Sequence, residues 1–194
     1  MIIGITGGTG CGKTTLLDLI RDRGGLVLDC DAVYHELLRS DKAMLAAIEV
    51  RFPGVVEDGQ LNRKKLGAIV FADKQALQDL NTITHGAVKR EVVRRLTDAH
   101  KLAAIDAIGL FEGGLAELCH VTVAVTAPLD ARVRRLTVRD GISEDYARAR
   151  IGAQREENWF RDKCGYILEN DGGLEAFRSK CLAFLAELGI METD

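Results

Sequence analysis

Several signatures of other protein classes are missing from this chain of 194 residues. Basic residues are not in excess, because 26 lysines and arginines stand against 29 acidic residues and the formal net charge is −3. Binding to a nucleic-acid backbone needs a clear basic excess, so the composition gives no support to such a partner. The N-terminal residues lack the basic flank and long apolar stretch of a signal peptide, and no apolar run approaches the roughly 20 residues of a membrane span. We therefore expect a cytoplasmic protein with neither a nucleic-acid nor a membrane partner.

Closely spaced cysteine pairs and proline-rich linkers are missing as well. The five cysteines are odd in number, far apart and never in a Cys-x-x-Cys pair (Cys11, Cys30, Cys119, Cys164 and Cys181). This distribution argues against a disulfide framework and a zinc site, and it favours reduced thiols. The length allows one substantial core and is too short for two ordinary domains, so we expect a single domain over residues 1–194. The sequence does not specify an oligomeric state.

Short apolar segments alternate with segments of helical periodicity. We expect strands at residues 1–6, 26–28, 102–107, 121–125 and 166–168. We expect helices at 13–23, at 129–139, from Ser143 as an N-cap, and at 174–188. Residues 32–101 look mostly helical, with breaks at Pro53-Gly54 and Asp58-Gly59. Strands that are apolar on both faces and separated by helices predict a parallel sheet covered on both sides, with ligands at the carboxyl ends of the strands.

A phosphate-binding loop follows the first predicted strand. Gly7-Gly8-Thr9-Gly10-Cys11-Gly12-Lys13-Thr14 fits the pattern G-x-x-x-x-G-K-[ST] at every fixed position, between a buried strand and a helix. The glycines let backbone N–H groups turn inward around an anion, and the following helix adds positive potential. We expect ATP to bind here, with Lys13 on the β- and γ-phosphates and the Thr14 hydroxyl on Mg²⁺. The residues expected to contact ATP in this loop are Gly8, Thr9, Gly10, Cys11, Gly12, Lys13, Thr14 and Thr15.

The loop and the order of elements predict an α/β fold. The expected architecture is a three-layer P-loop nucleoside-triphosphate hydrolase-like fold with a five-stranded parallel sheet. Its core is expected at about 1–31, 102–128 and 160–194, with a helical substrate-binding insertion at about 32–101 and a lid at about 129–159. No Asn-Lys-x-Asp segment, which GTPases use to read the base, occurs in the sequence, and large ATPases need a longer chain. Small size, the insertion and an arginine-rich segment favour a small-molecule kinase.

Carboxylates end the second and third predicted strands. A kinase for an alcohol needs a group that orients the hydroxyl and accepts its proton, and Asp29 or Asp31 could supply it. The alternative is a solvated turn that caps a helix starting at Ala32, and the spacing leaves both interpretations open. Asp106 ends the third strand, where P-loop proteins often place a carboxylate that orients magnesium.

A series of short motifs covers nearly the whole chain. They include Thr6 through Thr15, Leu28-Asp29-Cys30-Asp31, Asp58-Gly59-Gln60-Leu61-Asn62-Arg63, Thr84-His85, Leu110-Phe111-Glu112, Arg139-Asp140-Gly141, Ala153-Gln154 and Tyr166-Ile167-Leu168-Glu169-Asn170-Asp171-Gly172. In this order and at these intervals they resemble the dephospho-coenzyme A kinase family. The resemblance implies phosphorylation of the ribose 3′-hydroxyl of dephospho-coenzyme A by ATP with Mg²⁺. A nucleoside or nucleotide kinase, or a nucleotide-dependent regulatory protein, is the alternative.

The resemblance also implies roles for individual residues. Asp31 would be the base that faces the ribose hydroxyl, Arg139 and neighbouring arginines would contact ATP phosphates, and the segment near Asn170 would lie against adenine. On the acceptor side it implies Leu110 and Glu112, although Glu112 could instead cap a following helix. His85 would bind substrate or be a polar core residue.

Two further candidates come from the region after the second strand. His35, one helical turn after Asp31, would share its helix face. Arg63, with Lys64, would hold a pyrophosphate or be a surface charge.

Cys11 is either an oxidation-sensitive thiol or a small filler of the loop. The arginines between residues 132 and 155 are expected mostly on solvated helix faces, with Arg139 best placed for a closing lid.

The chain departs from the family pattern at three places. Gly86 follows His85 where the family has proline, so the turn expected there loses its fixed φ. Ala107-Ile108-Gly109 precedes Leu110 where the family has a proline, and Cys164-Gly165 replaces a small residue and aspartate. These departures are expected around the acceptor pocket and the last strand, not at the phosphate loop or Asp31.

Overall fold

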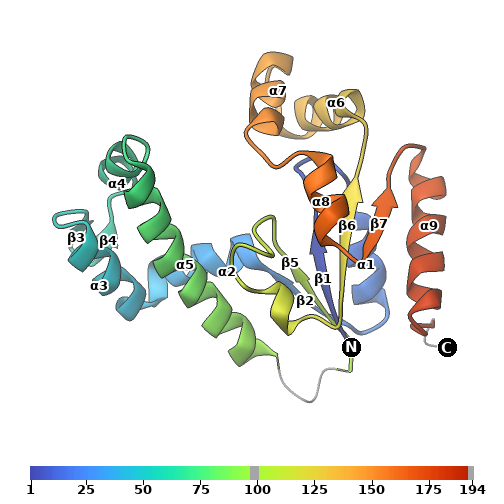
Figure 1. Cartoon of the computed structure of the whole chain (residues 1–194), viewed down its shortest axis with the longest axis horizontal. Coiled ribbons are helices and arrows are strands. Elements are labelled where there is room, and N and C mark those ends of the chain that lie inside the picture. The colour runs from blue at the N-terminus through green and yellow to red at the C-terminus, as the bar shows by residue number, and fades with distance from the viewer. Residues whose placement is uncertain (97–100, 192–194) are drawn as a thin grey trace.

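The computed structural model describes residues 1–96 and 101–191 (Figure 1). Its centre is a five-stranded sheet in the order β2-β5-β1-β6-β7, and all four strand pairings are parallel. The strands are β1 (Ile2–Thr6), β2 (Leu26–Asp29), β5 (Ala103–Asp106), β6 (Val121–Thr126) and β7 (Tyr166–Glu169). The predicted α/β P-loop fold and its five strands are therefore confirmed. Residues 97–100 of the expected insertion and 192–194 of the expected core lie outside the described residues.

Separate apolar cores pack on the two faces of the sheet. On one face, α1 (Lys13–Asp22) and α9 (Leu174–Glu187) cover the strands, with Leu16, Phe177 and Phe184 among the buried side chains. On the other face, α2 (Cys30–Ser40) and α5 (Lys74–Arg95) pack with the chain that follows β5, around residues such as Leu28 and Leu110. The sheet is thus the middle of three layers, as its strands, apolar on both faces, require.

The segment between β2 and β5 contains more than the predicted helices. It holds α2, α3 (Lys42–Arg51), α4 (Arg63–Val70) and α5, and it extends to one side of the sheet in Figure 1. The predicted break at Asp58-Gly59 is the turn of a small antiparallel hairpin, β3 (Val56–Glu57) and β4 (Gln60–Leu61), which the sequence did not predict. Asp58 and Gly59 have φ values of 49° and 76°, the left-handed pair that a two-residue hairpin turn needs.

The segment expected to form the lid, which we call the lid segment (129–159), holds two helices packed on each other. α6 (Leu129–Asp140) and α7 (Glu144–Gly152) share a small core of Val133, Leu136, Ala147 and Ile151. Gly141, with φ of 65°, ends α6, and the Ser143 hydroxyl accepts a hydrogen bond from the N–H of Tyr146, so its predicted N-cap role is confirmed. A further helix, α8 (Glu157–Lys163), was not predicted. Among the described helices, none is long and apolar enough to cross a membrane.

The core between α9 and the sheet gives a first testable prediction. Phe177 is 1% exposed, whereas Phe71 is 87% exposed at the end of α4. Phe177→Ala should lower the free energy of unfolding by about 3–5 kcal/mol, because it removes buried contacts and leaves a cavity. Phe71→Ala is the matched control and should change the free energy by no more than about 0.5 kcal/mol. Urea unfolding of both variants measures the difference, and equal effects would contradict this packing.

Candidate active site

The phosphate loop joins β1 to α1 and is shaped by glycines. Gly7, Gly10 and Gly12 have φ values of 128°, 78° and 97°, which residues with a side chain rarely adopt. Gly12 directly precedes α1, and in the part of the chain that the structure describes no side chain caps that helix. Its first N–H groups are therefore open to an anion, and the helix dipole adds positive potential there.

The charged groups of Lys13 and Asp106 lie close to each other beside the phosphate loop. The Lys13 ammonium donates to the carbonyl of Gly7 at 3.2 Å and lies 3.7 Å from Oδ1 of Asp106. That oxygen is buried, and within the described residues it has no hydrogen-bond partner. Burial raises the pKa of Asp106, the Lys13 charge opposes this, and the charges of Asp29 and Asp31 add to it.

The residues present fit a magnesium ion that arrives with phosphates. Thr14, on the first turn of α1, and Asp106 line the same cavity. No cluster of three or more histidine, cysteine or acidic side chains suited to a metal occurs in the described ranges. Mg²⁺ usually takes one or two protein ligands and completes its shell with phosphates and water. The Asp106 oxygen suits it, because among the described residues that oxygen accepts no hydrogen bond.

Asp29 and Asp31 have separate environments. One oxygen of Asp29 accepts from the N–H groups of Asp31 at 2.9 Å and of Ala32 at 3.0 Å, so Asp29 is the N-cap of α2. The helix begins at Cys30, earlier than the predicted start at Ala32. Because Asp29 provides the cap, the Asp31 carboxylate is left exposed on the first turn of α2.

Two cavities meet at Asp31. The larger, about 930 Å³, lies over the phosphate loop and is also lined by Arg134, Arg135 and Arg139 of α6. The smaller, about 270 Å³, lies between α2, α5 and the chain after β5. Its lining is mainly apolar, with Asn81, Thr84 and His85 as polar groups (lining residues include Cys30, Tyr34, Leu80, Val88, Ala107, Gly109 and Leu115). Asp31 and Ile108 line both cavities, so the carboxylate lies where a donor and an acceptor would meet.

The predicted acceptor residues are not all brought together. His85 lines the smaller cavity and is half-buried. His35 lines neither cavity, and its Nδ1 lies 3.3 Å from Nη2 of Arg63, with both side chains exposed. Leu110 is fully buried in the core, so its side chain makes no contact with either cavity.

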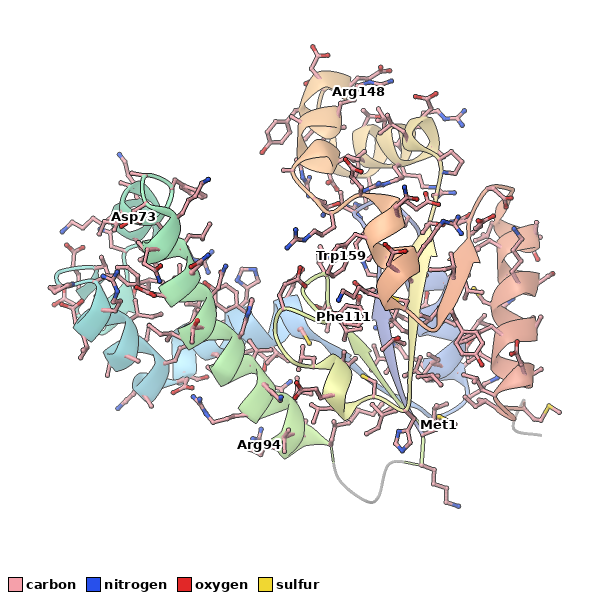
Figure 2. The ribbon with its side chains drawn as sticks, viewed as in Figure 1. Met1, Asp73, Arg94, Phe111, Arg148 and Trp159 are labelled. Atoms are coloured by element: carbon pink, nitrogen blue, oxygen red, sulfur yellow. The ribbon has the colours of Figure 1, made fainter. Side chains whose placement is uncertain are left out.

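Glu112 joins the chain after β5 to the lid segment. No helix begins beside it, since the 3-10 helix that follows is η1 (Ala116–Leu118), so the capping alternative is wrong. Its carboxylate pairs with Arg155 Nε at 3.2 Å. Phe111 and Trp159 lie edge to face beside this pair, with ring centroids 5.6 Å apart, and Figure 2 shows them between α8 and the loop. The Arg155 guanidinium also lies 5.3 Å from the Trp159 ring centroid.

Arg139, the arginine expected at the ATP phosphates, is paired on the surface. Its Nε and Nη2 donate to Asp140 at 2.6 and 3.0 Å, and Arg150 donates to the same carboxylate at 2.8 Å. The hydrogen bond from Arg139 is the main cause that lowers the pKa of Asp140 to about 2. Arg139 lines the larger cavity, and its contact with ATP stays a prediction.

Two arginines expected on solvated faces are instead half-buried against the phosphate loop. Arg132 contacts Thr9, and Arg135 Nη1 donates to the carbonyls of Gly10 at 3.1 Å and Cys11 at 3.2 Å. One sequence pattern could have predicted these contacts. The two arginines are three residues apart on the helix that follows β6, which places both on one helix face beside the central strands.

Asn170, expected near adenine, is buried and bound to the loop. Its amide donates to the Cys11 carbonyl at 2.8 Å and its oxygen accepts from Arg135 at 3.0 Å. A hollow of about 280 Å³ lies beside it, bounded by Ala131, Arg134, Arg135, Asn170, Asp171 and Gly172. Cys11 itself is 2% exposed, and burial raises the pKa of its thiol, which favours the small filler over a reactive cysteine.

The three departures from the family pattern have different surroundings. Gly86 lies inside α5, so the turn expected after His85 is wrong and the helix continues through this position. Ile108 lines both cavities. Gly165 precedes β7 and donates to the Thr122 hydroxyl at 3.1 Å, and it lines neither of the two cavities.

Comparisons of sequence with known proteins point to one family. The family model of dephospho-CoA kinase matches residues 1–176. A dephospho-CoA kinase from Anaeromyxobacter dehalogenans is 39% identical over 193 residues, covering 96% of this chain and 92% of that protein. A crystal structure of a Thermus thermophilus protein has a TM-score of 0.77 and 38% identity, with 97% of each chain covered. The dephospho-CoA kinase of Campylobacter jejuni shares the fold, with a TM-score of 0.67 and 23% identity over 98% of each chain. By its sequence and its fold, this chain belongs to the dephospho-CoA kinase family.

Proposed function

We propose that the protein transfers the γ-phosphate of ATP to the ribose 3′-hydroxyl of dephospho-coenzyme A, giving coenzyme A and ADP. Family membership supports this activity over a nucleoside kinase or a regulatory protein. The observation that carries it is the position of Asp31 on the wall shared by the phosphate-loop cavity and the smaller cavity. A protein that only binds a nucleotide has no need of a carboxylate at that point.

The donor half of the reaction belongs to the phosphate loop and the lid segment. Backbone N–H groups of the loop and the Lys13 ammonium hold the phosphates, and the Lys13 charge compensates charge that develops on the transferred group. We assign Thr14 and Asp106 to a magnesium ion that would arrive with ATP and would supply positive charge to its phosphates. Adenine is assigned to the hollow beside Asn170, and Arg139 to the phosphates after its pair with Asp140 opens.

The acceptor half belongs to Asp31 and the smaller cavity. In a loose phosphoryl-transfer transition state, the first task of the carboxylate is to aim the hydroxyl at phosphorus, and it then takes the proton. The smaller cavity, about 270 Å³, holds one part of the acceptor, with His85 among its polar contacts. We assign His35 and Arg63, which line neither cavity, to the diphosphate of the acceptor, since they bring a histidine and a guanidinium to within 3.3 Å of each other. A cytoplasmic location is part of this proposal, in keeping with the free thiols of all five cysteines.

An assay of ATP turnover tests the activity directly. The purified protein with ATP and Mg²⁺ should form ADP only when dephospho-coenzyme A is added, and the product should carry one additional phosphate by mass spectrometry. ADP formation without an acceptor would indicate a nucleotide-dependent regulatory protein instead. Faster turnover with free nucleosides than with dephospho-coenzyme A would indicate the other kinase class.

Replacement of Lys13 tests the donor side. Lys13→Ala should lower kcat by at least roughly 10²-fold, because a preorganised cation at the transferred group is lost. Far-UV circular dichroism should be unchanged, since the polar partners of the ammonium among the described residues are the Gly7 carbonyl and Asp106, at the site and not in the core. Lys42→Ala, on the exposed N-terminus of α3, is the control and should keep full activity. Near-normal turnover of Lys13→Ala would refute the assignment of the donor site.

A pair of substitutions tests Asp31 against its neighbour. Asp31→Asn removes the charge and basicity with almost no change in size, and kcat should fall by roughly 10²-fold or more, as in general-base removal. Asp29→Asn removes the same charge but keeps an oxygen that can cap α2, so kcat should fall much less. Steady-state rates with dephospho-coenzyme A and titration with ATP measure both effects. A larger loss in Asp29→Asn, or a loss of ATP affinity instead of rate in Asp31→Asn, would show that the base is misassigned.

A further inference from the structure

The peptide groups of Thr9, near the middle of the phosphate loop, are held by side chains far away in the sequence. The Thr9 N–H donates to Oε1 of Gln154 at 2.8 Å, and the Thr9 carbonyl accepts from Nε of Arg132 at 2.9 Å. Nη2 of Arg132 donates to the same Gln154 oxygen at 3.1 Å. These bonds close a triangle, which we call the Thr9 clamp (Thr9, Arg132 and Gln154).

The clamp accounts for one glycine, Gly8, that the phosphate-loop pattern does not require. Gly8 and Gly10 occupy variable positions of G-x-x-x-x-G-K-[ST]. Gly8 is not among the glycines with positive φ, so its backbone conformation does not call for glycine. A Cβ at Gly8 would lie 2.2 Å from Nη2 of Arg132 and 3.1 Å from Oε1 of Gln154. Gly10 has a φ of 78°, so its backbone conformation already calls for glycine. The absence of a side chain at Gly8 therefore leaves room for Arg132 and Gln154 to approach the backbone of the loop.

The clamp also joins the two ends of the lid segment to the loop. Arg132 is on the first turn of α6, and Gln154 follows the end of α7. α6 and α7 pack on each other and stand above the carboxyl ends of the strands in Figure 1. Neither clamp side chain lines the smaller cavity. Any effect of the clamp on catalysis should therefore act on the ATP side of the reaction.

We propose that Arg132 and Gln154 are positioning residues. They fix the Thr9 peptide groups and thereby hold the phosphate loop in a fixed position relative to the lid segment. They act through the backbone of the loop, by hydrogen bonds, and not through the charge of Arg132. Phosphoryl transfer depends on placing the donor phosphate within a fraction of an ångström, so a loosened loop costs rate. This inference rests on the proposed kinase activity.

Removal of the shared acceptor is the first test. Gln154→Ala should lower kcat/KM for ATP by roughly tenfold or more, because loss of a positioning contact misplaces the phosphates. KM for dephospho-coenzyme A should change less than about twofold, whereas general damage to the fold would disturb both substrates and the melting temperature. Gln75→Ala is the matched control, on an exposed glutamine that donates to Asp79, and its kinetics should match the wild type.

Changes at Arg132 separate geometry from charge. Arg132→Lys keeps the positive charge but cannot make both hydrogen bonds of the guanidinium, so it should be nearly as impaired as Arg132→Ala. Arg132→Ala/Gln154→Ala should lose little more than either single variant, because both act on one peptide. Full activity of Arg132→Lys, or multiplicative losses in the double variant, would overturn the clamp.

The inference and the proposed function fail in different ways. Absence of coenzyme A formation by the wild type overturns the proposed function. Wild-type ATP kinetics in Gln154→Ala, with an active wild type, overturn only the clamp.

Discussion

The carbonyl groups of the phosphate loop need hydrogen-bond donors, because a loop that turns its N–H groups toward an anion leaves its carbonyls facing the protein. The structure provides one for each carbonyl from residue 7 to residue 12. Two are backbone N–H groups, of Cys11 in the loop and of Thr15 on the first turn of α1, and one is the Lys13 ammonium. The remaining donors are side chains of Arg132, Arg135 and Asn170. The anion site on one side of the loop thus depends on a set of distant donors on the other side.

This requirement explains the arrangement of elements around β1. β6 lies beside β1 and leads into α6, which carries both arginines, and β7 lies next and leads to Asn170. These donors therefore come from the segments that directly follow β6 and β7, although they lie more than a hundred residues away from the loop in sequence. The proposed site for dephospho-coenzyme A lies toward the other edge of the sheet, where β2 ends in Asp29 and leads to Asp31. The side chains that bind the loop carbonyls and the carboxylate proposed to bind the phosphate acceptor thus approach the loop from opposite sides.

The sequence predicted those parts of the fold that depend on local patterns. Buried strands appear as short apolar runs, and the phosphate loop has a fixed spacing, so the sheet and the loop could both be located. The hairpin at Asp58-Gly59 was missed because its strands, each of two residues, are too short to show alternation. α8 was missed because its seven residues hold too few turns to display a helical period.

The candidate site was harder to predict, because its contacts depend on tertiary packing. Arg132 and Arg135 look like surface charges in sequence, and only the adjacency of β6 and β1 brings them to loop carbonyls. His35 shares a helix with Asp31, yet helical spacing does not say where a cavity ends, and His35 lies outside both. The choice between Asp29 and Asp31 also needed the structure, because either carboxylate could have capped α2.

The contact between Phe111 and Trp159 has an optical consequence. Trp159 is the chain's single tryptophan, and it lies where the lid segment meets the loop after β5 (Figure 2). Its indole therefore supplies the tryptophan fluorescence of the whole protein from one junction. The neighbouring Arg155 guanidinium and Phe111 ring set the local field and packing that determine the emission wavelength. Any ligand that shifts the lid segment relative to this loop would be visible in the emission spectrum of the unlabelled protein.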